Sequence, residues 1–379
     1  MVKTTHKILF ENASTLSGRV GQKSVNLILT SPPYPMIEMW DECFSSQDEA
    51  VRKMLEQGDA ERAFENMHQS LDQVWRQCIT VLKDNGFICI NIGDAVRTFN
   101  GDFKLFPNHA RITSFFRENG FHQLPSILWR KPANSPNKFM GSGMLPAGAY
   151  VTLEHEYILI FRKGGKRLFE TEQQKRLRRE SAIFWEERNK WYSDVWMDLR
   201  GISQNLANGS RTRSAAFPFD LAYRLVAMYS VKGDIVLDPF AGTGKTTAAC
   251  MALGRNSLGF DLDHSLQSEH EYLSGDIVKL ANTYNHNRLL QHLDFISNRA
   301  DTASYQNIYY EFPVVTKQES ELYLNRLTGL ATTDESIEIE YDEPSLTELI
   351  GTQPVNNHTF EKHKKRLSTA QQTEQRSLI

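Results

Sequence analysis

The hydrophobic positions of this chain fall into short apolar runs that are separated by longer amphipathic stretches. Short apolar runs that end in turn residues or small polar residues are typical of strands buried in a parallel sheet. The clearest runs are residues 8–10, 25–30, 87–92, 126–129, 157–161, 235–237 and 257–260. We therefore expect these segments to be buried parallel strands.

The stretches between the runs carry helical periodicity. Apolar residues recur at spacings of three and four at Phe64, Met67, Leu71, Val74, Cys78 and Leu82. Residues 107–119 form a shorter pattern with Pro near its start and Gly just beyond its end, and Leu221, Leu225 and Met228 mark another helix. Strands that alternate with helices predict an α/β fold, a doubly wound parallel sheet with helices on both faces.

Two regions interrupt this alternation. Residues 163–212 are highly charged and rich in aromatic side chains, and residues from 286 onward lose the alternation and end in a polar tail. We therefore divide the chain into residues 1–162, 163–212, 213–285 and a C-terminal extension, 286–379, that is partly disordered at its end.

Composition limits the class of protein and its location but does not identify a binding partner. The chain has 379 residues, 40% of them hydrophobic, and a formal net charge of -3, so any contact with nucleic acid must come from local basic patches. The four cysteines form no CxxC pair and no cluster with zinc spacing, so we expect no disulfide and no metal. The first residues lack a signal-peptide core and no apolar run is long enough to span a membrane, which predicts a cytoplasmic protein.

A glycine-rich loop follows one of the predicted strands. Residues 233–247 read GDIVLDPFAGTGKTT, a buried strand that runs through small residues into a helix near Lys245. A Walker A loop would need glycine at Pro239, and a dinucleotide fingerprint would need glycine at Thr247, so both phosphate-binding motifs fail. The next strand ends in Asp261, an acidic residue that suits two ribose hydroxyls and otherwise serves as a solvated turn residue.

A second loop ends the strand at residues 25–30. There the chain reads Ser31, Pro32, Pro33, Tyr34. The prolines fix the backbone and leave carbonyl oxygens free, so the Ser31 side chain and the Pro32 carbonyl can accept both hydrogens of an amino group. Tyr34 then offers a flat face for a base taken out of a duplex. Alone, these residues would indicate only a strand-ending turn with a packed tyrosine.

Together the two loops resemble those of the β-class DNA amino-methyltransferases, in which the catalytic motif precedes the cofactor loop. TSPPY, FPFDLAYRLVAMYSVKGDIVLDPFAGTGKTT, LKDNGFICINIGD, ILWRKPANSP and LEHEYILIFRKG carry the resemblance, which covers residues 7–285. It implies a seven-stranded, mostly parallel Rossmann-like sheet with circularly permuted motif order, and S-adenosyl-L-methionine as cofactor. It implies a cofactor pocket formed by Asn12, Phe217, Asp238, Pro239, Phe240, Ala241, Gly242, Thr243, Gly244 and Asp261.

The same resemblance implies the reaction. It makes residues 1–162 the catalytic half and residues 213–285 the cofactor half, with Ser31, Pro32, Pro33 and Tyr34 as the catalytic motif. Serine at position 31 favours N4 of cytosine, and N6 of adenine remains the alternative within the class. No cysteine follows a proline, so C5 methylation through a thiolate is excluded.

The region 163–212 occupies the place of a target-recognition region in that family. Arg162 to Arg179 holds eight Lys or Arg residues, enough to neutralise several phosphates. The candidate DNA-binding residues are Lys175, Arg176, Arg178, Arg179, Arg211 and Arg213. The expected partners are double-stranded DNA and a restriction endonuclease that cuts the same site. An inactive binding module, or methylation of RNA or protein, stays open.

Overall fold

The computed structural model describes residues 2–131, 145–148, 150–200, 217–298, 303–333 and 335–342. The described strands are β1 Val2–Leu9, β2 Val25–Thr30, β3 Leu82–Ile92, β4 Ala95–Phe99, β5 Asp102–Phe106, β6 Phe121–Arg130, β7 His155–Lys163, β8 Val195–Trp196, β9 Ile235–Asp238, β10 Asn256–Phe260, β11 Tyr305–Gln306, β12 Pro313–Val314, β13 Arg326–Thr332 and β14 Ile337–Asp342. The α-helices are α1 Asp41–Gln47, α2 Glu49–Gln57, α3 Ala60–Val81, α4 Asn108–Glu118, α5 Glu172–Glu180, α6 Trp185–Trp191, α7 Phe219–Tyr229, α8 Lys245–Leu253 and α9 Ile277–Ser297. The 3-10 helices are η1 Ala13–Gly18, η2 Glu38–Trp40, η3 His264–Ser274 and η5 Lys317–Glu319.

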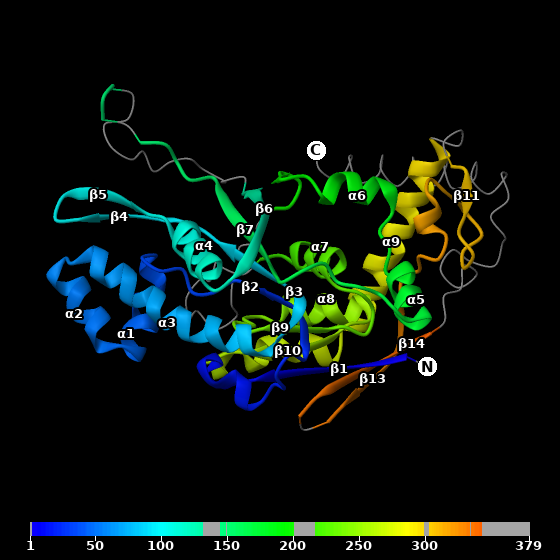
Figure 1. Ribbon diagram of the computed structural model, residues 1–379, viewed down its shortest axis with the longest axis horizontal. Helices are drawn as coiled ribbons and strands as arrows, with labels where there is room; N and C mark the ends of the chain where they lie inside the picture. Colours follow the sequence, from blue (N-terminus) through cyan, green and yellow to red (C-terminus); the bar gives the residue numbers. More distant parts are fainter. Residues whose placement is uncertain are drawn as a thin grey trace.

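One mixed sheet forms the centre of the molecule (Figure 1). Within the described ranges it has ten strands in the order β13-β14-β1-β10-β9-β2-β3-β7-β6-β8, so β8, β13 and β14 extend the seven-stranded sheet that the resemblance implies. The five neighbours from β1 to β3 are all parallel, so the α/β fold class with a mostly parallel sheet is confirmed. Every strand expected from an apolar run is present in this sheet.

The direction of β7 differs from the expectation. Residues 157–161 were expected in a parallel strand, but β7 runs antiparallel to both of its neighbours, β3 and β6. A strand that is buried on both faces has the same apolar pattern in either direction. The periodicity therefore predicts the existence of such a strand and leaves its direction open.

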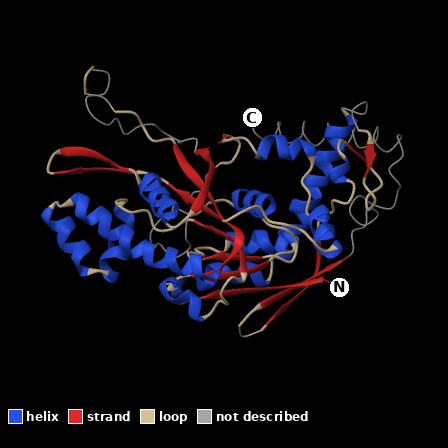
Figure 2. Cartoon of the chain, in the orientation of Figure 1, coloured by secondary structure: helices blue, strands red, loops and turns tan. Residues whose placement is uncertain are grey.

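Helices cover both faces of the sheet (Figure 2). Ile88 and Ile90 of β3 pack into one core with residues of α3 and α4, and Cys89 packs into the other core with residues of α7 and α8. Side chains alternate between faces along a strand, so each buried strand feeds both cores. The doubly wound arrangement follows from this. No helix within the described ranges combines the length and the apolar character that a membrane crossing requires.

The parallel strands place their loops at a common edge. β1 starts beside the N label in Figure 1, near α5 and α9, and runs away from them. Residues 10–13, 31–34, 239–244 and 261–263 follow β1, β2, β9 and β10 and so lie at the carboxyl ends of adjacent strands. The chain order reverses between β2 and β9, and such a switch point is where open α/β sheets bind ligands.

The C-terminal region continues the main sheet. β14 pairs antiparallel with β1, and β13 pairs with β14. The Tyr341 hydroxyl bonds to Thr4 Oγ1 at 2.8 Å and donates to the Met251 carbonyl at 2.7 Å. The division drawn at residue 286 falls inside α9, because the loss of α/β alternation there reflects one long helix followed by antiparallel strands.

We expect substitutions in β14 to reduce the stability of the whole fold. Ile339 is fully buried in the core that α7, α8 and α9 share, so Ile339→Ala should lower the free energy of unfolding by about 2–5 kcal/mol. Thr328→Ala, at an exposed position of the neighbouring β13, should change it by less than about 0.5 kcal/mol. Urea unfolding measures both, and equal stabilities would show that these strands are only appended to the core.

Candidate active site

The loops at the carboxyl edge line one cavity of about 300 Å³. Most of the residues expected in the catalytic and cofactor sites meet there. Those in its lining are Asn12, Ser31, Pro33, Phe217, Asp238, Pro239, Phe240, Ala241, Gly242, Thr243 and Asp261. Pro32, Tyr34 and Gly244 do not line it.

Asp238 joins the two principal loops. Its carboxylate accepts hydrogen bonds from Thr30 Oγ1 and Thr246 Oγ1, each at 2.6 Å, and from the Phe240 amide at 3.1 Å. Thr30 is the residue before Ser31, so this carboxylate fixes the end of β2 against the end of β9. Burial raises the pKa of Asp238 to about 6, and the two threonine hydroxyls oppose that rise. The cavity therefore has a buried carboxylate that a cationic group would stabilise in its charged form.

The glycine loop is held in a fixed shape. Gly242 and Gly244 have φ values of +52° and +75°, which disfavour other residues, and the Gly242 amide donates to Asp261 Oδ2 at 2.8 Å. On the other side of the loop, the His270 ring and the Tyr272 hydroxyl bond to the carbonyl oxygens of residues 242 and 243 at 2.7 and 3.0 Å. Asp261 thus shapes the loop as well as lining the cavity.

The segment after the SPPY loop supplies a wall of the cavity that the sequence did not reveal. Met39, Trp40, Cys43 and Phe44, from η2 and α1, line it together with the glycine loop. No spacing or motif marks these residues in the sequence. Their contribution depends on the position of η2 and α1 in the fold, which no local pattern specifies.

Ser31 and Tyr34 occupy different environments. Ser31 lines the cavity, whereas the Tyr34 side chain is only 3% exposed. The Tyr34 hydroxyl lies 3.1 Å from Ser31 Oγ and donates to Glu156 Oε2 at 3.0 Å. Burial, together with the Glu156 carboxylate, raises the pKa of Tyr34 well above its usual value, so the hydroxyl keeps its hydrogen. A stacking role for the ring stays a prediction.

Three residues beside the SPPY loop were not singled out from the sequence. Asn91 is fully buried and donates from Nδ2 to the Tyr34 hydroxyl at 2.8 Å and to Glu156 Oε2 at 2.6 Å. Lys131 forms an ion pair with Glu156. A detectable signal existed at two of these positions, because Asn91 interrupts the apolar run of β3 and Glu156 immediately precedes that of β7.

Two smaller features allow this packing. The side chain of Asn108 donates to the carbonyl oxygens of Pro35 and Gly93, both at 3.0 Å, and so anchors the chain just after the SPPY loop. A Cβ at Gly93 would lie 3.1 Å from the Tyr34 ring and 3.3 Å from Glu156. Glycine at position 93 therefore permits the close approach of these two side chains.

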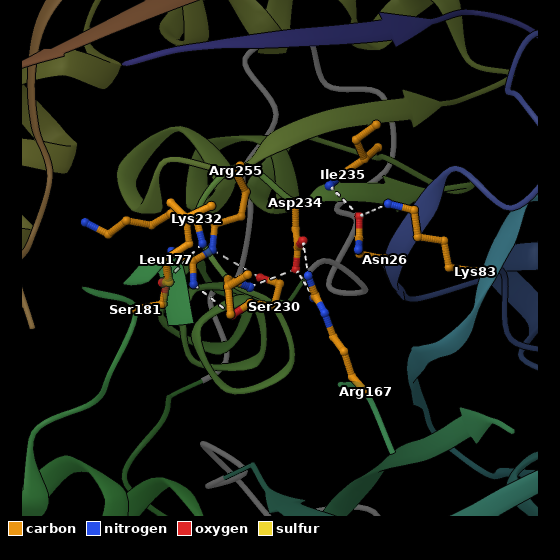
Figure 3. Close-up of polar contacts among 12 residues, drawn as sticks. Asn26, Lys83, Arg167, Leu177, Ser181, Ser230, Lys232, Asp234, Ile235 and Arg255 are labelled. Atoms are coloured by element: carbon orange, nitrogen blue, oxygen red, sulfur yellow. Dashed lines mark hydrogen bonds and ion pairs between the residues drawn. The ribbon is translucent and has the colours of Figure 1, made fainter. Parts of the chain in front are cut away.

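The basic part of residues 163–212 packs against the opposite end of the sheet. Arg167 pairs with Asp234 at 2.5 Å, and the Lys232 amide donates to Ser181 Oγ at 2.9 Å (Figure 3). Asp234 directly precedes β9, whereas the glycine loop follows that strand. The interval that contains α5 therefore joins the amino end of β9, and the cavity lies at its carboxyl end.

Each of the four candidate cations of α5 interacts with a carboxylate or an aromatic ring of the protein. Lys175, Arg176 and Arg179 pair with Glu172, Glu180 and Glu321 at 2.7, 2.5 and 2.7 Å. Arg178 lies over the ring of Phe169. The structure does not bring these cations to the cavity. Arg211 and Arg213 lie outside the described residues.

The aromatic part of the same interval belongs to the fold itself. Trp191 and Trp196 are buried in the core formed with α7 and α8, and β8 pairs with β6 at the edge of the main sheet. The Trp129 indole donates to the Leu199 carbonyl at 2.9 Å. Residues 185–199 thus extend the main sheet and its cores.

One cluster of metal-ligating types is present within the described ranges. Glu186, His292 and Glu319 place ligand atoms within 4.8 Å of one another. Both ring nitrogens of His292 already have partners, Glu186 at 2.8 Å and the Pro313 carbonyl at 3.3 Å. The expectation of no metal remains a prediction, and this cluster packs α6 against α9.

Known proteins are similar to this chain over much of its length. The DNA methylase family model matches residues 25–271. The type II methyltransferase M.MthZI of Methanothermobacter thermautotrophicus is 49% identical over 325 residues, 85% of this chain and 91% of that protein. M.MjaI of Methanocaldococcus jannaschii is 47% identical over 277 residues, 70% of this chain and 90% of that protein. The crystal structure of TTHA0409 from Thermus thermophilus, complexed with S-adenosyl-L-methionine, is 29% identical with a TM-score of 0.55 over 72% of this chain and 95% of that one.

The pKa of Asp238 predicts a pH-dependent stability. An unfolded aspartate releases its proton near pH 4, whereas folded Asp238 holds it to about pH 6, so between these values a rise in pH favours unfolding. Asp238→Asn removes this term. The stability of the parent should therefore fall relative to that of the variant by about 2 kcal/mol from pH 4 to pH 7. Urea titrations across this range measure it, and a constant difference would contradict the assignment.

Proposed function

This chain belongs to the DNA methylase family, and we propose that it transfers a methyl group from S-adenosyl-L-methionine to N4 of cytosine in double-stranded DNA. Membership of the family makes it a DNA methyltransferase with S-adenosyl-L-methionine as the methyl donor. The observation that supports transfer to an amino group is that Ser31 lines the same cavity as the glycine loop. A target amino group held at Ser31 would thus meet the methyl donor.

The residues that line the cavity fit S-adenosyl-L-methionine. We assign Asp261 to the ribose hydroxyls, Asn12 to the adenine end, and Phe217 with Asp238 to the cationic methionine end. The loop from Pro239 to Gly244 would pass beneath the ligand, where its glycines leave room for close backbone approach. A carboxylate buried at Asp238 favours a cation, which agrees with the charges of this cofactor.

The chain's own contribution to the reaction is orientation. When bound, S-adenosyl-L-methionine supplies an activated methyl group on sulfur. Ser31 Oγ and the Pro32 carbonyl would accept the two hydrogens of the target amine, which turns its lone pair toward that methyl group. The cavity wall formed by residues 39–44 would exclude water. Alignment of this kind can contribute much of the reduction in barrier, and no covalent enzyme intermediate is needed.

The choice of cytosine depends on the residue that opens the motif. In β-class amino-methyltransferases a serine before PPY mostly accompanies N4-cytosine methylation, and an aspartate mostly accompanies N6-adenine methylation. Ser31 therefore supports cytosine, with N6 of adenine as the second candidate. The relatives M.MthZI and M.MjaI are named type II methyltransferases, which supports a role in protecting DNA from a partner restriction endonuclease.

Mass analysis of nucleosides tests this proposal directly. DNA and RNA from cells that express the protein are digested and compared with those from cells that carry the empty vector, and the modified sites are sequenced. N4-methylcytosine in DNA is the expected result. N6-methyladenine would retain the reaction and change the base. A new methylated nucleoside in RNA alone would overturn the substrate, and cofactor binding without any new methylated nucleoside would favour an inactive binding module.

The placement of α5 leads us to assign the DNA contact to Arg211 and Arg213. In the sequence, Arg211 and Arg213 come shortly before Phe217, which lines the cavity, whereas α5 lies at the other end of β9. DNA must approach the carboxyl edge for its base to reach Ser31. The Lys175–Glu172 ion pair is exposed on both sides, so it contributes little stability that neutralisation could remove.

Two double variants separate the two basic segments. Arg211→Gln with Arg213→Gln should weaken DNA binding and reduce the slope of log affinity against log salt by up to about two units, since each phosphate contact contributes about 0.9. Lys175→Gln with Arg178→Gln should leave affinity and slope at parental values. Fluorescence anisotropy at several salt concentrations measures both. The reverse pattern would place the DNA surface at α5.

A further inference from the structure

The Ser31 hydroxyl is the cavity end of a buried hydrogen-bonded chain. Ser31 Oγ lies 3.1 Å from the Tyr34 hydroxyl, which contacts Asn91 Nδ2 at 2.8 Å and Glu156 Oε2 at 3.0 Å. Lys131 pairs with the other oxygen of Glu156. The chain therefore leads from the wall of the cavity to an ion pair at the start of β7.

The donor and acceptor of each hydrogen bond in this series follow from the number of hydrogens that each group carries. A tyrosine hydroxyl has one hydrogen and two lone pairs. Because the Glu156 carboxylate paired with Lys131 can only accept, the Tyr34 hydrogen goes to Glu156. The Tyr34 oxygen then accepts from Asn91 and, at its remaining lone pair, from Ser31. The Ser31 hydroxyl must therefore donate away from the cavity.

The orientation of the Asn91 amide supports this count. In the opposite orientation its carbonyl oxygen would face the Glu156 carboxylate at 2.6 Å, two acceptors in contact. With Nδ2 in that place, its two hydrogens serve Tyr34 and Glu156. The remaining oxygen, Oδ1, is buried and has no partner among the described residues. A buried acceptor without a partner destabilises the fold, so the two hydrogen bonds from Asn91 Nδ2 must offset this loss.

We propose that Glu156 and Asn91 are positioning residues that orient the Ser31 hydroxyl as an acceptor toward the target base, and so select an exocyclic amine over a carbonyl oxygen. The inference rests on the proposed function, because it assigns a target to Ser31. With its hydrogen held by Tyr34, Ser31 presents only lone pairs to the cavity. Cytosine has an amino group at C4 that can donate to Ser31. Uracil has a carbonyl oxygen at C4, which would face the Ser31 oxygen as a second acceptor and be repelled.

Glu156→Gln should change the direction of the chain while keeping its shape. Glutamine has a single acceptor oxygen, and if that oxygen stays with Lys131 its amide group faces both Tyr34 and Asn91. The Tyr34 hydrogen then loses its acceptor at residue 156, so the Ser31 hydroxyl is no longer held as a donor to Tyr34 and can donate into the cavity. We expect the turnover rate to fall at least about tenfold, while the affinity for S-adenosyl-L-methionine and the melting temperature stay near parental values. Tyr34→Phe removes the connection between Ser31 and Glu156 and should have the same effect on turnover.

The decisive readout is base discrimination. Two duplexes carry the site found by sequencing and differ only in cytosine or uracil at the target, and their affinities are measured with S-adenosyl-homocysteine present. The ratio of affinities, cytosine over uracil, should fall at least about fivefold from the parent to Glu156→Gln and to Tyr34→Phe. Parent and variants meet the same two duplexes, so the lower cost of extruding a mismatched base cancels from the comparison. If sequencing finds adenine as the target, adenine and hypoxanthine replace the pair.

Glu154→Gln is the matched control. Glu154 lies two residues before Glu156, is 40% exposed and pairs with Arg130 outside the chain of hydrogen bonds, so its substitution should leave the ratio unchanged. A parental ratio in folded Glu156→Gln and Tyr34→Phe would overturn the inference, as would an equal change in Glu154→Gln. Methyl transfer by the parent to the unsubstituted duplex reports the proposed function separately, and its absence would overturn both.

Discussion

The buried carboxylate of Asp238 is the constraint on which the site depends. By accepting from Thr30 and Thr246 it ties together the ends of β2 and β9 and the start of α8. The SPPY loop and the glycine loop therefore leave the sheet at a fixed separation. Parallel pairing of β2 with β9 makes this contact possible, because only parallel neighbours end at the same edge.

The carboxyl and amino ends of the parallel strands consequently form different kinds of contact. The carboxyl edge holds the cavity and the chain of hydrogen bonds that begins at Ser31. The amino edge carries ion pairs such as Arg167 with Asp234, which hold the segment around α5 against β9. Part of the positive charge in this segment thus pairs within the fold, and a contact between α5 and DNA stays a prediction.

Much of the fold and of the cavity could be predicted because the signals are local. A buried strand that ends in SPPY, and another that ends in DPFAGTG, each specify a strand, a loop and an edge from adjacent residues. The direction of β7, the pairing of β14 with β1 and the contacts of Glu156 with Tyr34 depend on residues far apart in sequence. The burial of Tyr34 could not be predicted either, because the motif specifies the ring and not its surroundings.

The rate of a single turnover by Ser31→Ala tests the central claim most directly. The variant removes one acceptor from the cavity wall and leaves the glycine loop and Asp261 untouched. The account predicts methyl transfer at least about tenfold slower than in the parent, with the affinity for S-adenosyl-L-methionine unchanged within about twofold. A parental rate with the same cofactor affinity would contradict it, because the SPPY loop would then be only a turn beside the cavity.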